Sequence, residues 1–207
     1  MQLICKDLTI GRQKEHILLT HINLVLLEGT MTLLSGPNGI GKTSFLRTIS
    51  TYLRPLSGHI TLDGYILDQN SQYHVAYLGH ENGLKHNLSV LEYLSFCARL
   101  FSISSSPQTL RLKMLMEHFN VTPLATVPIS YLSHGQKRRV ALVGFLLNQA
   151  KILLLDEPFN GLDRESRTLL SSYLMEIKEN HIILYTNHLT EVRCHDDAID
   201  LTDYKPC

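Results

Sequence analysis

The sequence predicts an α/β fold: a mainly parallel sheet with helices, an antiparallel β region at the start of the chain and a small helical lobe. Three observations lead to this class. Apolar and polar residues alternate from Leu3 to Ile10 and from Ile22 to Leu26, as in half-buried antiparallel strands. Later, short aliphatic runs alternate with helical periodicity, which is typical of a parallel α/β core. Between these parts the periodicity is mainly helical.

Each element has its own local signals. Further strands are expected at 31–35, 59–62, 75–78, 152–155, 182–185 and 198–201. Helices are expected at 44–53, 89–100 and 110–119, from about 132 to 147, and at 166–177. Turn residues such as Glu28-Gly29 and Asp63-Gly64 separate the strands, and Pro107 suits a helix start.

The length and composition are those of one domain with an appended lobe. We expect a single domain, 1–207, in which 1–80 and 148–207 form the β region and the parallel core, while about 84–147 form the helical lobe. Lys plus Arg and Asp plus Glu number 19 each, so no bulk positive field favours nucleic acid as a partner. The apolar runs are strand-sized, well below the roughly 18 residues that suggest a membrane helix. Any membrane part is therefore expected on another chain.

A phosphate-binding loop lies between the strand at 31–35 and the following helix. Its residues, Gly36, Pro37, Asn38, Gly39, Ile40, Gly41, Lys42 and Thr43, match G-x-x-x-x-G-K-[ST] and are followed by Ser44. The glycines let backbone N–H groups point at an anion, and the helix N-terminus adds partial positive charge. Lys42 is expected to reach the phosphates of ATP, and the Thr43 hydroxyl to bind Mg²⁺.

Two acids follow the aliphatic strand Ile152–Leu155. Ligands of parallel sheets bind at the carboxyl ends of the strands, where Asp156 and Glu157 fall. We expect Asp156 to hold Mg²⁺ and Glu157 to polarise the attacking water as general base. The two motifs together predict a nucleotide-hydrolysing site, although they also fit nucleotide kinases.

A third motif narrows the reaction. Leu132-Ser133-His134-Gly135-Gln136 resembles the signature of ATP-binding cassettes, usually LSGGQ, and a basic helix follows it as in that family. The resemblance implies a P-loop NTPase (RecA-like) core with an antiparallel β subdomain and a small α-helical signature subdomain. It also implies a homodimer, because in the family Ser133 and its neighbours His134, Gly135 and Gln136 would bind the γ-phosphate of the other subunit's ATP.

Two further segments extend the resemblance. One segment, Asn160-Gly161-Leu162-Asp163, resembles the family's D-loop, which crosses the dimer seam. Asp163 is the acidic residue of this loop. His188, after the strand at 182–185, occupies the position of the switch histidine and would hydrogen-bond the γ-phosphate. Together with Lys42 and Glu157, His188 is therefore expected to be catalytic.

The sequence departs from the cassette pattern at three positions. His80 stands where the Q-loop glutamine is usual, so it either contacts the Mg²⁺-bound water or is a loop residue that faces solvent. His134 replaces the first signature glycine, while Gly135 is kept. No aromatic residue follows the first strand to stack on adenine, and Arg12 is the substitute that we expect.

The whole chain most resembles one subgroup, the ATP-binding subunits of the haem exporter of cytochrome c maturation. The resemblance implies integral membrane permease subunits as partners, a peripheral location at the cytoplasmic face of the inner membrane, and only an indirect role for haem. Three alternatives stay open: the ATPase subunit of another exporter, a soluble cassette ATPase that acts on ribosomes or DNA, and a small-molecule kinase.

Overall fold

The computed structural model describes residues 1–11, 16–80, 83–101, 106–188 and 194–206. The chain divides into two compact units. The first unit comprises Met1–Gly79, Ala150–Pro158 and Leu174–Cys207, and the second comprises His80–Gln149 and Phe159–Tyr173.

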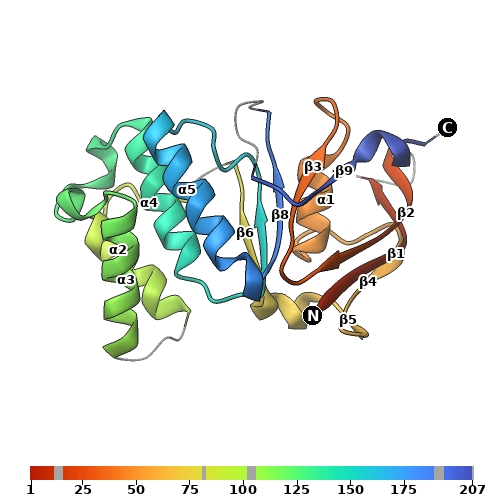
Figure 1. Ribbon diagram of the computed structural model, residues 1–207, viewed down its shortest axis with the longest axis horizontal. Coiled ribbons are helices and arrows are strands. Elements are labelled where there is room, and N and C mark those ends of the chain that lie inside the picture. Colours follow the sequence, from red (N-terminus) through yellow and green to blue (C-terminus); the bar gives the residue numbers. More distant parts are fainter. Residues whose placement is uncertain (12–15, 81–82, 102–105, 189–193, 207) are drawn as a thin grey trace. The chain divides into compact units, whose positions relative to one another are not determined.

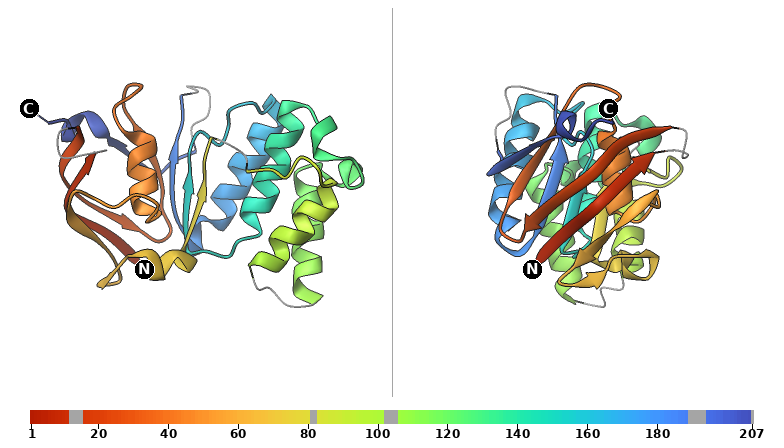
Figure 2. Two further views of the ribbon diagram at one scale, coloured as in Figure 1. Left: turned by 180° about the vertical axis from the view of Figure 1, so that it is seen from behind. Right: turned by 90° about the vertical axis from the view of Figure 1, so that its right-hand side faces the viewer.

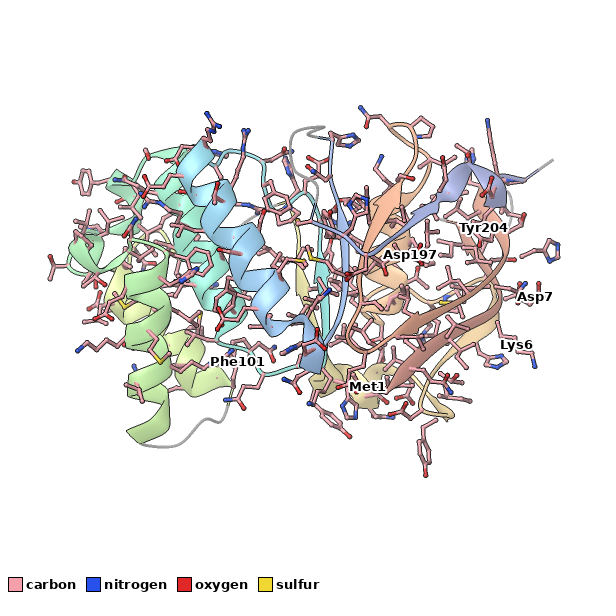
Figure 3. The ribbon with its side chains drawn as sticks, viewed as in Figure 1. Met1, Lys6, Asp7, Phe101, Asp197 and Tyr204 are labelled. Carbon is pink, nitrogen blue, oxygen red and sulfur yellow. The ribbon has the colours of Figure 1, made fainter. Side chains whose placement is uncertain are left out.

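The first unit contains a four-stranded antiparallel sheet (Figure 1). Its strands are β1 (Gln2–Gly11), β2 (Ile17–Leu27), β4 (Ser57–Leu62) and β5 (Tyr65–Ile66), in the order β2-β1-β4-β5. The predicted alternation is observed on either side of an irregularity in β1: Leu3, Leu8 and Ile10 are buried, while Lys6 and Asp7, where the register shifts, are both exposed. Figure 3 shows Lys6 on the side of this sheet that faces away from the core.

The same unit contains a five-stranded sheet in which every pair is parallel. Its strands are β3 (Met31–Ser35), β6 (Val75–Leu78), β7 (Ile152–Leu155), β8 (Ile182–Thr186) and β9 (Asp197–Asp200), in the order β6-β7-β8-β3-β9. β7 and β8 are buried at every position, which explains their continuous aliphatic runs. The predicted α/β class with a parallel core and an antiparallel sheet is confirmed.

Helix α1 (Lys42–Ile49) lies between the two sheets (Figure 2). Phe45, Leu46 and Ile49 are fully buried in a core that receives side chains from both sheets. Each contributes about 1.5–3 kcal/mol by burial. The helix ends before Leu53, so the predicted extension of this helix is wrong. The reason is Thr51, whose φ of 62° takes the chain out of the helical path.

The second unit is helical. It contains α2 (Val90–Leu100), α3 (Ser106–His118), α4 (His134–Leu146) and the first part of α5 (Arg164–Ile177). Capping boxes start α2 at Ser89 and α4 at Ser133. The start of α5 belongs here because the His118 ring hydrogen-bonds the Leu169 carbonyl at 3.2 Å and contacts Tyr173. The sequence pattern does not indicate this membership.

Short 3₁₀ turns complete the described elements. They are Gln69–His74, Thr122–Leu124, Ile129–Tyr131, Lys178–Asn180 and Leu201–Tyr204. Among the residues that the structure describes, no helix has both the length and the apolar character required to cross a bilayer.

Candidate active site

The sequence motifs of the first unit meet in one cavity of about 680 Å³. Its walls are Leu18, Asn38, Gly39, Gly41, Lys42, Thr43, Ser44, Asp156, Glu157 and His188. They come from four segments: strand β2, the loop before α1 together with the first turn of that helix, the carboxyl end of β7 and the chain after β8. The position agrees with the rule that parallel sheets bind ligands at the carboxyl ends of their strands.

The loop between β3 and α1 has a backbone that requires glycine. Gly36 has a φ of 133° and Gly41 a φ of 120°. A Cβ atom on Gly36 would lie 3.1 Å from the Ile40 side chain, and one on Gly41 would lie 3.4 Å from Leu19. Glycine therefore lets the loop reach the head of α1, whose free N–H groups and partial positive charge favour an anion.

Lys42 is the cation of this loop. Its Nζ donates hydrogen bonds to the carbonyls of Gly36 at 2.8 Å and Pro37 at 3.1 Å. Burial lowers the pKa of Lys42, while the carboxylates of Glu157 and Asp156 oppose part of this shift. A phosphate in the cavity would offer this buried ammonium stronger, charge-assisted hydrogen bonds.

The carboxylate of Asp156 is held from two sides. Its Oδ2 accepts a hydrogen bond from the Thr43 hydroxyl at 2.7 Å, and its Oδ1 accepts one from the Thr186 hydroxyl at 2.8 Å. Tyr77 donates a longer one of 3.4 Å to Oδ2, and burial raises the pKa of this phenol, which keeps its proton. A hydroxyl and a carboxylate oxygen so placed are the hard donors that Mg²⁺ prefers.

Glu157 and His188 are in direct contact. His188 Nε2 lies 3.1 Å from Glu157 Oε1, and both side chains are partly open to the cavity. Glu157 also has a φ of 50°, in the left-handed region that non-glycine residues seldom adopt. The structure thus brings together Lys42, Thr43, Asp156, Glu157 and His188, which the sequence places up to 146 positions apart.

The remaining predicted site residues have other positions. Ser133, His134, Gly135 and Gln136 form the start of α4 in the second unit, and Asp163 belongs to the same unit. His80 is exposed, and Arg12 lies outside the described residues. None of the described ones is a wall of the cavity of the first unit.

Inside the second unit, the start of α4 packs against the segment before α5. The Ser133 hydroxyl accepts the Gln136 N–H, and the Gln136 side chain accepts the Ser133 N–H. A Cβ atom on Gly161 would lie 2.5 Å from His134 Nδ1, so the imidazole lies directly against Gly161. Asp163 caps α5 by accepting the Ser166 N–H at 2.8 Å, and this bond is the main cause of its lowered pKa.

The His134 contact predicts a size-dependent coupling. Gly161 has a φ of 76°, so Gly161→Ala is expected to destabilise the protein by about 1–2 kcal/mol through backbone strain and further by displacing His134. In a His134→Ala background, Gly161→Ala introduces only the backbone strain, so its loss of stability is smaller. Thermal unfolding of the two single variants and the double variant measures this; strictly additive losses would contradict the contact.

Sequence reasoning missed three residues around the cavity: Leu18, Tyr77 and Thr186. Leu18 belongs to an alternating strand, and alternation does not show that this strand passes the loop at Gly41. Thr186 carried a usable signal, since it is a polar residue at the carboxyl end of a buried strand, two positions before His188. For Tyr77, the sequence contains no signal of a role at the cavity beyond the position of this residue in β6.

Comparisons with known proteins agree with this geometry. The family model described as ABC transporter matches residues 19–160. The chain is 33% identical over 195 residues to the cytochrome c biogenesis ATP-binding export protein CcmA of Haemophilus influenzae. The aligned region covers 92% of this chain and 91% of that protein. A protein of the same name from Wolbachia pipientis wMel is 31% identical over 98% and 97% of the two chains.

Solved structures show the same fold. A putative ABC transporter ATP-binding protein from Pyrococcus furiosus superposes with a TM-score of 0.88 and 31% identity over 100% of both chains. The family match spans more than half of this chain and includes the phosphate loop, the start of α4 and both acids after β7. The chain belongs to the ABC transporter family and is an ATP-binding subunit of that family.

Proposed function

We propose that this subunit binds ATP with Mg²⁺ and hydrolyses it as a homodimer that drives a separate membrane permease. The observation that carries the proposal is the convergence of Lys42, Thr43, Asp156, Glu157 and His188 in one cavity. A cation, a hydroxyl–carboxylate pair and a carboxylate–imidazole pair are the groups that phosphoryl transfer to water requires.

The donor set fits a magnesium ion. Thr43 and Asp156 would hold it, because both are walls of the cavity and their oxygens, which are hard donors, lie 2.7 Å apart. Bound there, Mg²⁺ would neutralise charge on the phosphate oxygens. Lys42 would add a second positive charge by exchanging its carbonyl partners for phosphate oxygens.

Glu157 is the group that accepts the proton. As the water oxygen bonds to the γ-phosphorus, the bond from that phosphorus to the bridging oxygen breaks, and the water proton passes to the Glu157 carboxylate. His188 already contacts this carboxylate at 3.1 Å, so it keeps the base oriented toward the γ-phosphate position. Leu18 supplies an apolar wall of the cavity for the rest of the nucleotide.

The second half of each site would come from another copy of the chain. The start of α4 presents N–H groups at a helix N-terminus, which favours an anion, and Ser133 and Gly135 stand at the signature positions. We therefore place Ser133, His134, Gly135 and Gln136 against the γ-phosphate held by the partner copy. Asp163 would lie at the seam.

A mixing experiment tests the homodimer. Lys42→Ala inactivates the phosphate loop, whereas Ser133→Asp keeps the helix cap but places negative charge where the γ-phosphate would bind. Each variant alone is expected to be inactive. When the variants are mixed in equal amounts, half of the dimers contain one copy of each. In such a dimer, one of the two sites combines an intact phosphate loop with an intact signature segment, so about a quarter of the wild-type ATPase rate should return. A mixture as inactive as its components would rule out shared sites.

The permease partner is proposed from the relatives. ATP-binding subunits of ABC transporters act with membrane subunits, and the relatives from Haemophilus influenzae and Wolbachia pipientis are named cytochrome c biogenesis ATP-binding export proteins. We propose the same system here: the haem exporter of cytochrome c maturation, at the cytoplasmic face of the inner membrane, with haem touched only by other components. His80 is the position proposed to couple ATP to the permease.

Capture from detergent-solubilised membranes tests this assignment. A tagged chain with Glu157→Gln, incubated with MgATP, is expected to retain a multi-helix membrane protein. Deleting the gene should remove mature c-type cytochromes while other exported cargo is unaffected. Retention of ribosomes or DNA instead would favour a non-transport ATPase, and normal cytochromes after deletion would favour another exporter.

A further inference from the structure

Thr186 joins the two acids of the candidate active site through one hydroxyl group. The residue ends β8 and has no exposed surface. Its hydroxyl donates to Asp156 Oδ1 at 2.8 Å and accepts the backbone N–H of Glu157, also at 2.8 Å. A threonine hydroxyl has a single proton, so its whole donor capacity is spent on Asp156.

Strand register places the hydroxyl there. β7 and β8 pair in parallel with Leu155 opposite Tyr185, so the next residue of each strand, Asp156 and Thr186, are neighbours. Both are buried, Asp156 at 3% exposure. A buried acceptor or donor without a partner costs about 1–3 kcal/mol, more for a charged group. The contact is therefore a strong constraint on both groups.

The Glu157 backbone needs such a constraint. Its φ of 50° is unfavourable by about 1–3 kcal/mol for a residue with a side chain, and the surrounding structure has to maintain it. The bond from Glu157 N–H to Thr186 fixes the peptide group on the N-terminal side of that strained residue. It thereby fixes the direction in which the Glu157 side chain leaves the chain, toward His188.

The two oxygens of the Asp156 carboxylate accept hydrogen bonds from different residues. Oδ1 is occupied by Thr186, and Oδ2 faces the Thr43 hydroxyl at the phosphate loop. Rotation of the carboxylate would break both hydrogen bonds. Thr186 therefore presents one chosen oxygen, Oδ2, to the cation position.

We propose that Thr186 is a positioning residue for the hydrolysis step, one that sets the orientation of the cation-binding acid and of the base together. This role rests on the proposed ATPase function. A serine at this position would keep both hydrogen bonds. Valine would fill the same space but leave Asp156 Oδ1 and the Glu157 N–H without this partner.

Steady-state ATPase kinetics of Thr186→Val and Thr186→Ser test the role. Loss of a supporting hydrogen bond next to a metal ligand typically costs 10–100-fold, so we expect Thr186→Val to lower kcat by about 10–100-fold. It should also raise the Mg²⁺ concentration that gives half-maximal rate, while KM for ATP changes by less than about threefold, because the Lys42 loop is intact. Thr186→Ser should return kcat and the Mg²⁺ requirement close to the wild type.

Thr32→Val is the matched control. Thr32 is a buried threonine of the neighbouring strand β3, opposite Leu184 of β8, and it is not a wall of the cavity. Its variant should keep both the wild-type kcat and the wild-type Mg²⁺ requirement. A similar loss in Thr32→Val would show that any buried threonine of this sheet has the same effect, and it would overturn the role.

Three further results complete the test. If Thr186→Val does not fold, Thr186→Cys replaces it: its weak donor predicts a kcat between those of serine and valine, and a wild-type kcat would overturn the role. A folded Thr186→Val with wild-type kcat and Mg²⁺ requirement would overturn it too. An inactive wild-type chain would instead count against the proposed function itself.

Discussion

Glu157→Gln is expected to stop ATP turnover while ATP still binds. Glutamine has nearly the same shape as glutamate but cannot accept the proton of the attacking water, and general-base catalysis contributes about 10²–10⁴-fold. The phosphate loop, with Lys42, is unchanged. An ATP-bound dimer should therefore accumulate. Size-exclusion chromatography in the presence of MgATP should detect this dimer, and a phosphate-release assay should measure the loss of turnover.

Glu176→Gln is the matched control for this result. Glu176 is an exposed acid of α5 outside the cavity, so its variant should hydrolyse ATP at the wild-type rate and form no trapped dimer. Wild-type turnover by Glu157→Gln would refute the assignment of the base. Loss of turnover without retained ATP would show that Glu157 acts in binding instead.

Lys42→Ala is expected to weaken nucleotide binding strongly and, with it, to remove hydrolysis. Lys42 is a buried cation beside the phosphate loop, and its Nζ donates hydrogen bonds to two loop carbonyls. Removing one partner of a buried, charged hydrogen bond costs about 2–5 kcal/mol, which corresponds to roughly 30-fold to several-thousand-fold weaker ATP binding. Equilibrium binding of a fluorescent ATP analogue measures it.

Lys6→Ala supplies the comparison for a general loss of positive charge. Lys6 is exposed on β1 and points away from the core (Figure 3), so its variant should bind the analogue with wild-type affinity. Circular dichroism of both variants checks the fold. If Lys42→Ala binds the analogue within about threefold of the wild type, the loop is not the phosphate site.

Much of the fold and of the candidate site could be predicted because the signals are local. The strands at 31–35, 75–78 and 152–155 have the predicted bounds. The phosphate loop, the two acids and His188 each lie at a strand end that the hydrophobic pattern already marks. Residues that act from contiguous motifs are therefore recognisable in the chain itself.

The end of α1 shows where local signals fail. The apolar periodicity continues to Leu53, yet the helix ends at Ile49, because Thr51 adopts a left-handed conformation that its residue type disfavours. Such a conformation depends on the packing of the chain around it. The helical periodicity of the sequence carries no information about that packing.

The sequence by itself determined the α/β class, the order of the strands along the chain and the motif residues Lys42, Asp156, Glu157 and His188. Only the tertiary structure decided which groups hold them. Thr43, on α1, meets Asp156 across 113 positions, and Thr186 meets it across 30 through the parallel pairing of β7 and β8. Local patterns specify which face of a strand is buried, whereas the partner of a buried hydroxyl depends on strand order and register, which packing of the whole unit selects.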